Sequence, residues 1–431
     1  MFFYLPEGLD LSFLPPLRRP AAEWFLHKLF IQKTHRKLKK NDFIKMHSKI
    51  LIRFMGAPHY VKIIKSLIKH GIILKSANYV KGKHSYGYRL TDSFCCRKHH
   101  RLEVTNKPLM KKIIKRQTER EYFWSDIHFW LKMNMKNHLT ITSQSFKHKE
   151  DMLSVQRIID GDFFASVCQY GRFHTNITNL RKSLRNDLRL DGKKIVEMDI
   201  SNSQPLMLFI LAKDFISNKG KLSGINAYPV SKQHQDSIVD NTPPLCLHFC
   251  EEYNCIKNNK EDANSLPDDL CLYGTLCETG RLYEHLMTLM EVNSNKRNKF
   301  KKDCFKKIFY CRNEHQNNKW SKLFENEFPS VMQVIKELKK KDYRHAPQLM
   351  QRVESDFMIH RVCGRIKNEY PDMRIITIHD SILSAGANMA IIKKIMEEEF
   401  SKMGVYPKLK EPRWFPSDDE IKPLVYLMKE N

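Results

Sequence analysis

Two short apolar runs that lead into aspartates limit most strongly what this chain can fold into. The first covers residues 196–200 and contains Asp199, and the second covers residues 375–378 and leads into His379 and Asp380. Runs of this length and composition are typical of buried strands, so each delivers an aspartate to the edge of a sheet. One such aspartate is usually a turn or cap residue. Two of them can hold divalent cations, which prefer oxygen ligands on a rigid support.

The residues around each aspartate resemble motifs of known enzymes. Residues 170–175 (YGRFHT), followed by an Asn-Leu pair, are similar to the "GR-x-HT … NL" approach to the first catalytic aspartate of family A DNA polymerases. Residues 199–204 (DISNSQ) resemble the "DYSQIE" motif of that family, with Gln204 in place of its glutamate. Residues 379–381 (HDS) instead resemble single-subunit, phage-type RNA polymerases, since family A enzymes usually read "HDE" there. The two motifs point to two related polymerase groups.

The segment between the aspartates contains a basic amphipathic pattern. Two cations and two aromatic residues recur every fourth residue and so share one helix face: Arg297, Lys301, Phe305 and Phe309. The spacing resembles the R-x3-K-x3-F-x3-Y fingers helix of both groups, in which the cations grip the incoming triphosphate and the aromatics pack on its base and sugar. Phe309 replaces the tyrosine, and Tyr310 stands where glycine is usual. A register that starts at Lys302 would use Tyr310 instead, so the register stays open.

Two further segments occur in the order that the resemblance implies. Residues 349–351 (LMQ) open a helical run through residue 366, similar to the "MQ … A" helix ahead of the second aspartate in family A. An amphipathic helix over residues 390–400 then closes the palm. The resemblance covers roughly residues 165 to 415. It implies a set of nucleic-acid contacts: Arg172, His174, Arg181, Gln351 and His379.

The charge of the chain favours a polyanionic partner. Lys and Arg number 74 against 48 Asp and Glu, a net charge of +26, and residues 1–150 hold 31 basic and 10 acidic residues, a net of +21. No apolar run reaches the roughly 20 residues that span a bilayer. Residues 1–17 contain two acids and a Pro-Pro pair, which does not fit a secretory signal. We expect a soluble, intracellular protein without a membrane partner, cytoplasmic if it comes from a bacterium or phage.

Residues 42–94 of the basic region have their own pattern. A helix opens at Pro58 and ends at residues 70–71, a strand follows at 72–74, and a hairpin-like stretch extends over residues 81–90. A helix followed by a basic hairpin resembles a winged helix, which implies DNA contacts from the helix and the wing. The candidate contacts are Lys62, Lys65, Lys69, Lys81 and Lys83. The alternative is a helical linker with an incidental hairpin.

The predicted fold class is α+β, with a right-hand polymerase palm and fingers preceded by a basic, mostly helical N-terminal region. A chain of 431 residues is expected to form two or three domains. We expect a basic region over 1–105 with the winged-helix-like module at about 42–94, a helical connecting region over 106–164, and palm and fingers over 165–431, with fingers at about 206–348.

The 11 cysteines indicate reduced thiols rather than a disulfide framework. Cys246, His248, Cys250 and Cys255 invite a zinc site, but they lack paired C-x2-C units. Residues 95–100 (CCRKHH) are a weaker candidate, because adjacent cysteines rarely reach one ion together.

The resemblance implies a template-directed nucleotidyltransferase, a DNA-dependent DNA polymerase that acts on a primer and template. Asp199, Asp380 and the carbonyl of Ile200 would hold two Mg²⁺ ions, which Mn²⁺ could replace. Arg297 and Lys301 would stabilise the phosphates, and the bulk at the Gln204 position favours dNTPs over NTPs. A small polymerase joined to a DNA-binding module indicates replication of a mobile element, plasmid or virus.

Three alternatives remain open at the level of sequence. The first is a single-subunit DNA-dependent RNA polymerase or primase-like enzyme. The second is a non-catalytic DNA-binding replication initiation protein, although the intact aspartates and fingers cations weigh against lost catalysis. The third is a metal-dependent nuclease, which would not need a helix that grips a triphosphate. The sequence does not identify a protein partner.

Overall fold

The computed structural model describes residues 1–35, 38–39, 41–77, 79, 85–95, 97–142, 149–218, 220, 222 and 266–412, which form a mixed fold of many helices and short antiparallel strands. Several residues singled out in the sequence lie outside these ranges: Lys81, Lys83, Cys96, Cys246, His248, Cys250 and Cys255.

A five-stranded antiparallel sheet of order β11-β12-β10-β9-β6 brings the two aspartate runs together. Its strands are β6 (Leu139–Ile141), β9 (Leu188–Leu190), β10 (Lys193–Asp199), β11 (Ile375–Ile378) and β12 (Ser381–Ala385). The edge strand β6 comes from the region that was expected to be a helical connection. That region therefore supplies part of the same sheet.

Both faces of the sheet are buried, which explains why its strands are nearly continuous apolar runs. Successive side chains of a strand point to opposite faces. Ile195 belongs to the apolar cluster that includes α7 (Lys149–Ile159), whereas Val196 and Met198 belong to the cluster that includes α9 (Ser203–Ser217) and α17 (Met389–Lys402). The helix predicted over residues 390–400 is thus confirmed as α17.

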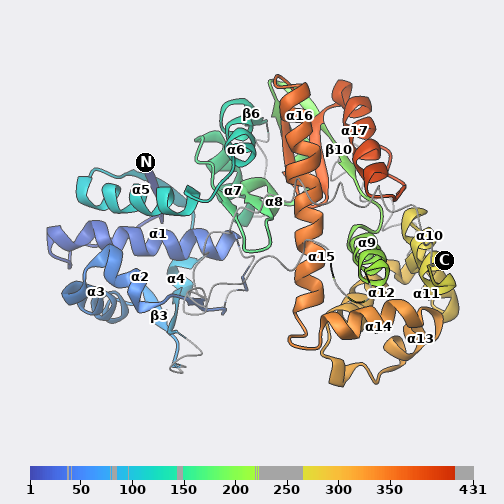
Figure 1. The fold of residues 1–431 in the computed structure, drawn as a ribbon. Coiled ribbons are helices and arrows are strands. Elements are labelled where there is room, and N and C mark those ends of the chain that lie inside the picture. The colour runs from blue at the N-terminus through green and yellow to red at the C-terminus, as the bar shows by residue number, and fades with distance from the viewer. Residues whose placement is uncertain are drawn as a thin grey trace, which may run out of the picture.

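A long helical segment from His345 to Glu369 stands between the N-terminal elements and the helices α9–α14 in the view of Figure 1. It consists of α15 (His345–Ser355), a π-helical stretch (Asp356–Cys363) and α16 (Gly364–Glu369). The helical run predicted from residue 349 to 366 lies within it. Its buried side chains join the same core as β10 and α9, so it fixes α15 against the aspartate end of the sheet.

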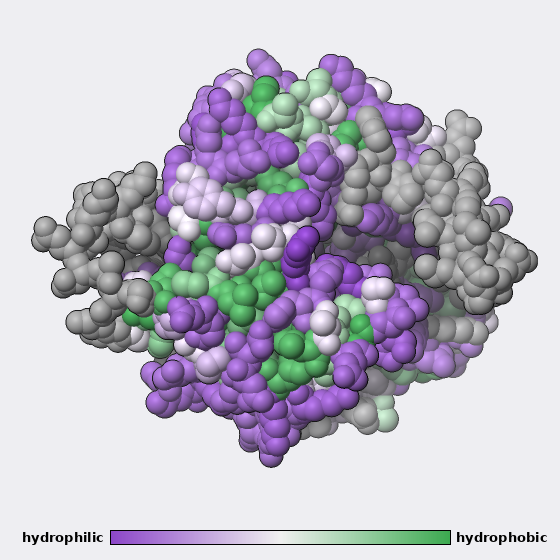
Figure 2. All heavy atoms as spheres, turned by 90° about the vertical axis from the view of Figure 1, so that its right-hand side faces the viewer, coloured by the Kyte–Doolittle hydropathy of each residue, from purple (hydrophilic) through white to green (hydrophobic). Residues whose placement is uncertain are grey.

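Helices between β10 and α15 form a compact group. They are α10 (Asp268–Glu278), α11 (Leu282–Leu289), α12 (Arg297–Cys304), α13 (Lys319–Glu327) and α14 (Pro329–Leu338), with a π-helical turn, Phe305–Phe309, directly after α12. Their apolar side chains enter the core shared with α9. The outer face on this side is mainly hydrophilic, with apolar areas lying among polar side chains (Figure 2).

The N-terminal region has a separate apolar core. It comprises β1 (Phe2–Pro6), α1 (Arg19–His35), β2 (Ile44–Lys45), α2 (Ser48–Met55), α3 (Ala57–Lys69), β3 (Ile73–Lys75), β4 (Gly87–Leu90), α4 (Asp92–Cys95), β5 (His99–Glu103) and α5 (Lys107–Glu121). β2, β4 and β3 form one sheet, and β1 pairs with β5. Between α5 and β6 lies α6 (Asp126–His138).

The helix predicted to open at Pro58 is observed as α3, with Pro58 in its first turn. Ile63, Ile64 and Leu67 of α3 are buried, while its three lysines, Lys62, Lys65 and Lys69, are exposed. The helix therefore presents a basic face to solvent. Contact of this face with DNA stays a prediction.

Within the described part of the chain, every helix is too short or too polar to cross a bilayer.

Close packing between α9 and α10 depends on Gly274. A Cβ at this position would overlap the ring of Phe209, whereas a Cβ at Gly364, also helical, would meet its nearest atom at 3.9 Å. We expect Gly274→Ala to lower the free energy of unfolding by about 1–3 kcal/mol through overpacking. Gly364→Ala should be neutral or stabilising by up to about 1 kcal/mol. Urea unfolding of both variants checks this, and equal effects would contradict it.

Candidate active site at one end of the sheet

The two aspartates lie at the same end of the central sheet. Asp199 is paired with Ser381 across β10 and β12, and the pairing of Ile378 with Ser381 leaves His379 and Asp380 as a two-residue turn. Such tight hairpins need positive φ, and His379 has φ 54°. The amide of Ile200 donates to the carbonyl of Asp380 at 3.4 Å. The turn thus holds Asp380 beside the end of β10.

Negative charge is concentrated at this end of the sheet. Burial raises the pKa of Asp380 to about 7, and the carboxylates of Glu354 and Asp199 add to the rise, while Lys410 opposes it. Carboxylates that are hard to ionise together form a donor set that suits a hard cation. Asp199 and Asp380 therefore fit the predicted Mg²⁺ ligands. The contact seen for Ile200 involves its amide, so the role of its carbonyl stays a prediction.

The described residues contain no group of three or more His, Cys, Asp or Glu side chains that could hold a metal ion. A site at the sheet end would use two carboxylates, with the remaining coordination positions open to a backbone carbonyl, substrate or water.

Glu354 of α15 is a central residue of the site that the sequence did not reveal. Its carboxylate is 1% exposed and accepts hydrogen bonds from Arg172 Nε at 2.9 Å, Arg172 Nη2 at 2.5 Å and Ser203 Oγ at 2.9 Å, and from Gln204 Nε2. A buried carboxylate needs such partners to offset its lost hydration. In the sequence, Glu354 is one of two acids in a mixed polar and apolar helical run, the other being Asp356, so its burial is not evident there.

Glu354 also fixes the orientation of Gln204. An ionised carboxylate can only accept hydrogen bonds, so the Gln204 amide turns its NH₂ group toward Glu354. Gln204 Oε1 is left buried and has no hydrogen-bond partner in the described part of the chain. The position expected to meet the nucleotide sugar thus presents a hydrogen-bond acceptor.

Three of the predicted nucleic-acid contacts lie together. Arg172 and His174 belong to the hairpin of β7 (Ala165–Val167) and β8 (Phe173–Thr175), and the rings of His174 and His379 lie 5.5 Å apart. Burial and the Arg172 charge lower the pKa of His174, and the same two causes, with His174, lower that of His379 to about 4. Both rings are therefore neutral near pH 7. Arg181 instead pairs with Asp151 at 2.9 Å.

The two cations predicted for the fingers helix, Lys301 and Arg297, differ in their contacts with the site. Burial lowers the pKa of Lys301, and the negative charges of Asp380 and Asp199 counteract this shift. Its ammonium also lies 5.6 Å from the centre of the Tyr283 ring. Arg297 lies over the same ring but forms an ion pair with Glu284. Of the two predicted fingers cations, Lys301 is the one whose charge interacts with both aspartates.

The π-helical turn bears on the register that the sequence left open. The amide of Tyr310 donates to the carbonyl of Phe305 at 2.8 Å, five residues earlier, so Tyr310 follows Phe305 on one face of the widened helix. Phe309 is 1% exposed and packs against Phe324, whereas Tyr310 is 36% exposed. Burial of Phe309 does not fit its predicted contact with a nucleotide. Contact of Tyr310 with a nucleotide stays a prediction.

Tyr310 also connects the fingers turn to α15. Burial raises the pKa of its phenol, and a hydrogen bond with the Gln351 side chain opposes the rise. The charges of Arg172 and Glu354 act on the same phenol. Gln351, predicted to contact the primer-template, therefore lies beside the Glu354 network.

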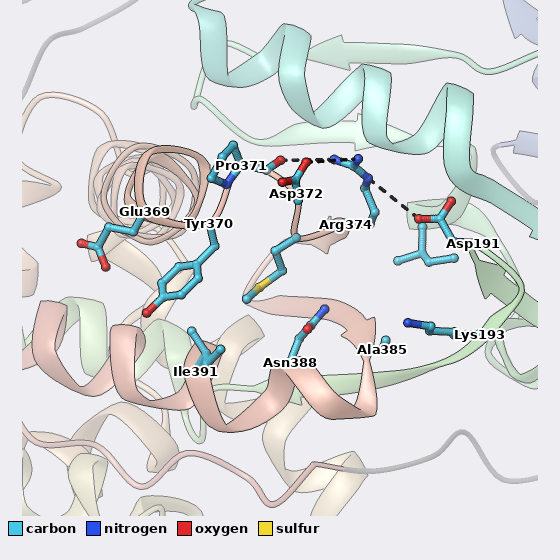
Figure 3. A pocket seen from close by; sticks show the side chains of 12 residues that line it. Asp191, Lys193, Glu369, Tyr370, Pro371, Asp372, Arg374, Ala385, Asn388 and Ile391 are labelled. Atoms are coloured by element: carbon cyan, nitrogen blue, oxygen red, sulfur yellow. Dashed lines mark hydrogen bonds and ion pairs between the residues drawn. The ribbon is translucent and has the colours of Figure 1, made fainter.

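A cavity of about 480 Å³ lies at the opposite end of the sheet, away from both aspartates. Residues from the start of β10, the end of β12 and the segment before β11 line it, as Figure 3 shows. Arg374 in its wall forms ion pairs with Asp191 at 3.9 Å and Asp372 at 3.8 Å. None of the predicted site residues lines this cavity.

Comparisons with known proteins add little to the geometry. No protein-family model matches the sequence, and no curated protein matches it. Among solved structures, the chain is similar to the POL domain of Pol1 from M. smegmatis in complex with DNA primer-template and dNTP, with 11% identity and a TM-score of 0.29. The match covers 62% of this chain and 52% of that one, so this chain spans about half its length. A likeness at this level establishes neither a shared fold nor a shared activity.

The raised pKa of Asp380 predicts how stability depends on pH. A carboxyl whose pKa rises from 3.8 to about 7 on folding takes up a proton between these values, so stability falls as pH rises through this window. Asp380→Asn should remove the fall and raise the free energy of unfolding at pH 8 by roughly 1–3 kcal/mol after solvent screening. Urea unfolding in EDTA at pH 5 and pH 8 measures this. Parallel pH profiles for both proteins would contradict it.

Proposed function

We propose that this chain is a template-directed nucleotidyltransferase, most closely similar in its motifs to family A DNA polymerases. The observation that carries the proposal is the meeting of Asp199, Asp380 and Lys301 at one sheet end. These residues come from three segments far apart in the sequence, and their types supply what phosphoryl transfer needs: oxygen ligands for cations and a positive charge for phosphates.

Asp199 and Asp380, with the carbonyl of Ile200, would hold two Mg²⁺ ions, and Mn²⁺ could replace them. Bound there, such ions would lower the pKa of an attacking 3′-hydroxyl and neutralise a leaving pyrophosphate. The high pKa of Asp380 supports this assignment, because a divalent cation would offset both causes of the rise, the burial of the carboxylate and its repulsion by Glu354 and Asp199.

The residues of the chain itself would bind and orient the substrates. Lys301 stabilises negative charge on the triphosphate, and Arg297 joins it once it leaves Glu284. Tyr310 packs on the nucleotide at the base of the fingers turn. The neutral His379, with Arg172 and Gln351, contacts the primer-template and offers hydrogen bonds.

The bulk of Gln204 supports dNTPs as the substrates, because a long side chain at the sugar position crowds a 2′-hydroxyl. One observation favours the alternative of an RNA polymerase or primase-like enzyme. The buried Oε1 of Gln204 is an acceptor without a described partner, and a ribose 2′-hydroxyl could donate to it. The choice of sugar is therefore part of the test below.

The basic N-terminal region would bind the nucleic acid outside the active site. The exposed lysines of α3, Lys62, Lys65 and Lys69, support this role together with the net charge of +21 in residues 1–150. A polymerase with its own DNA-binding module fits the replication of a mobile element, plasmid or virus. A purely DNA-binding initiation protein would not need the charged sheet end.

Primer extension tests the proposed activity. With a labelled primer-template and Mg²⁺, we expect extension with dNTPs and much less with NTPs. Asp199→Ala and Asp380→Ala should each lower the rate by at least about a thousandfold, because each removes a cation ligand. DNA binding, measured by fluorescence anisotropy, should change less than about threefold. Primer extension that persists in Asp380→Ala would contradict the proposal. Cleavage of the DNA in the absence of nucleotides would favour a nuclease.

The neighbouring aromatic residues of the fingers turn should respond differently to truncation. Phe309→Ala should lower the free energy of unfolding by about 3–5 kcal/mol, because it empties a buried site. Tyr310→Ala should cost much less stability but raise the KM for the nucleotide about tenfold or more, because it removes a stacking surface. Urea unfolding and steady-state extension give both quantities. A larger KM effect for Phe309→Ala than for Tyr310→Ala would contradict the register.

A further inference from the structure

The segment after α17 returns to the aspartate end of the sheet. Leu409 forms a β-bridge with Ile200, and the amide of Lys410 donates to the carbonyl of Asp199 at 3.0 Å. A second attachment lies two residues earlier, where the amide of Lys408 donates to the carbonyl of Glu278 at 2.6 Å. Backbone contacts therefore place Lys410 beside Asp199 independently of its charge.

The side chain of Lys410 uses this position to form an ion pair with Asp199 Oδ2. Asp199 is nearly buried, whereas the Lys410 side chain is 42% exposed. The ammonium can therefore leave the carboxylate for solvent without unfolding the segment, because its long stem swings while the backbone stays paired.

We infer that Lys410 is a built-in counter-ion of the metal site that competes with the divalent cation for Asp199. The inference rests on the proposed function, because it needs Asp199 to be a cation ligand. In the metal-free protein, the ammonium holds the Asp199 carboxylate in place. Binding of a divalent cation must displace it, since two positive charges on one carboxylate repel each other.

The surroundings distinguish Lys410 from the other lysine of the site. Lys301 comes from α12 and lies against the rings of Tyr283 and Phe305, so aromatic contacts hold its ammonium. Lys410 is the lysine that pairs with the carboxylate itself. Displacement would release one positive charge next to Lys301, where the triphosphate is proposed to bind. The net positive charge of the site would then increase by less than the full charge of the added cation, because one ammonium leaves as the cation binds.

Removal of the competing ammonium should strengthen metal binding. Mn²⁺ binding to the full chain, measured by the loss of the free-ion EPR signal without nucleotide or DNA, gives a dissociation constant that does not depend on activity. We expect Lys410→Met to bind Mn²⁺ roughly two- to fivefold more tightly than the unsubstituted protein, the size expected for a half-exposed ion pair. Lys410→Arg keeps the charge and should bind Mn²⁺ like the unsubstituted protein.

Two controls make the outcomes separable. Lys408→Met removes one lysine from the same segment, and we expect the affinity for Mn²⁺ to stay unchanged, because Lys408 forms no ion pair among the described residues. Asp199→Ala should abolish binding at the site. Circular dichroism verifies that each variant is folded.

Equal or weaker Mn²⁺ binding in Lys410→Met, with binding still lost in Asp199→Ala, would overturn the counter-ion role and leave the proposed function standing. An equal gain in Lys408→Met would also overturn it, because the effect would then be general surface charge. Mn²⁺ binding that is absent from the unsubstituted protein, or that survives Asp199→Ala, would overturn the metal site and this inference with it.

Discussion

Two aspartates held side by side at a partly buried sheet end repel each other, and the polar contacts around them offset that repulsion. The turn between β11 and β12 gives Asp380 no freedom to move away, because Ile378 and Ser381 pair directly on either side of it. Charge must therefore be balanced by neighbours. Lys410 and Lys301 supply positive charge on one side, and Arg172 neutralises Glu354 on the other.

Glu354 links three elements of the site through hydrogen bonds. Its four hydrogen bonds join α15 to the β7–β8 hairpin through Arg172 and to α9 through Ser203 and Gln204. Hydrogen bonds specify direction and apolar contacts do not, so this carboxylate sets how the side chains of α9 are turned at the sheet end.

The sequence predicted the elements of the site better than their contacts. Apolar runs ending at Asp199 and Asp380 are strong local signals, and their meeting follows once both runs are buried strands. The helices at Pro58, Arg297 and residues 390–400 follow from similar periodicity and are observed. Glu354 and Lys410 could not be found in this way, because each acts on a residue more than 140 positions away. The strand β6 was missed because three residues are too few to show alternation.

The π-helical turn after α12 has a consequence for comparing this chain with others. A π turn is what results when one residue is inserted into an α-helix without breaking it. The four-residue spacing therefore holds up to Phe305, and the π turn adds one residue before the helix ends at Phe309. An alignment without a gap would equate the buried Phe309 with the last position of the R-x3-K-x3-F-x3-Y spacing, whereas the residue that hydrogen-bonds back to Phe305 is the more exposed Tyr310. Deletion of a single residue between Phe305 and Phe309 would restore the α-helical spacing and place the tyrosine, not the phenylalanine, four residues after Phe305.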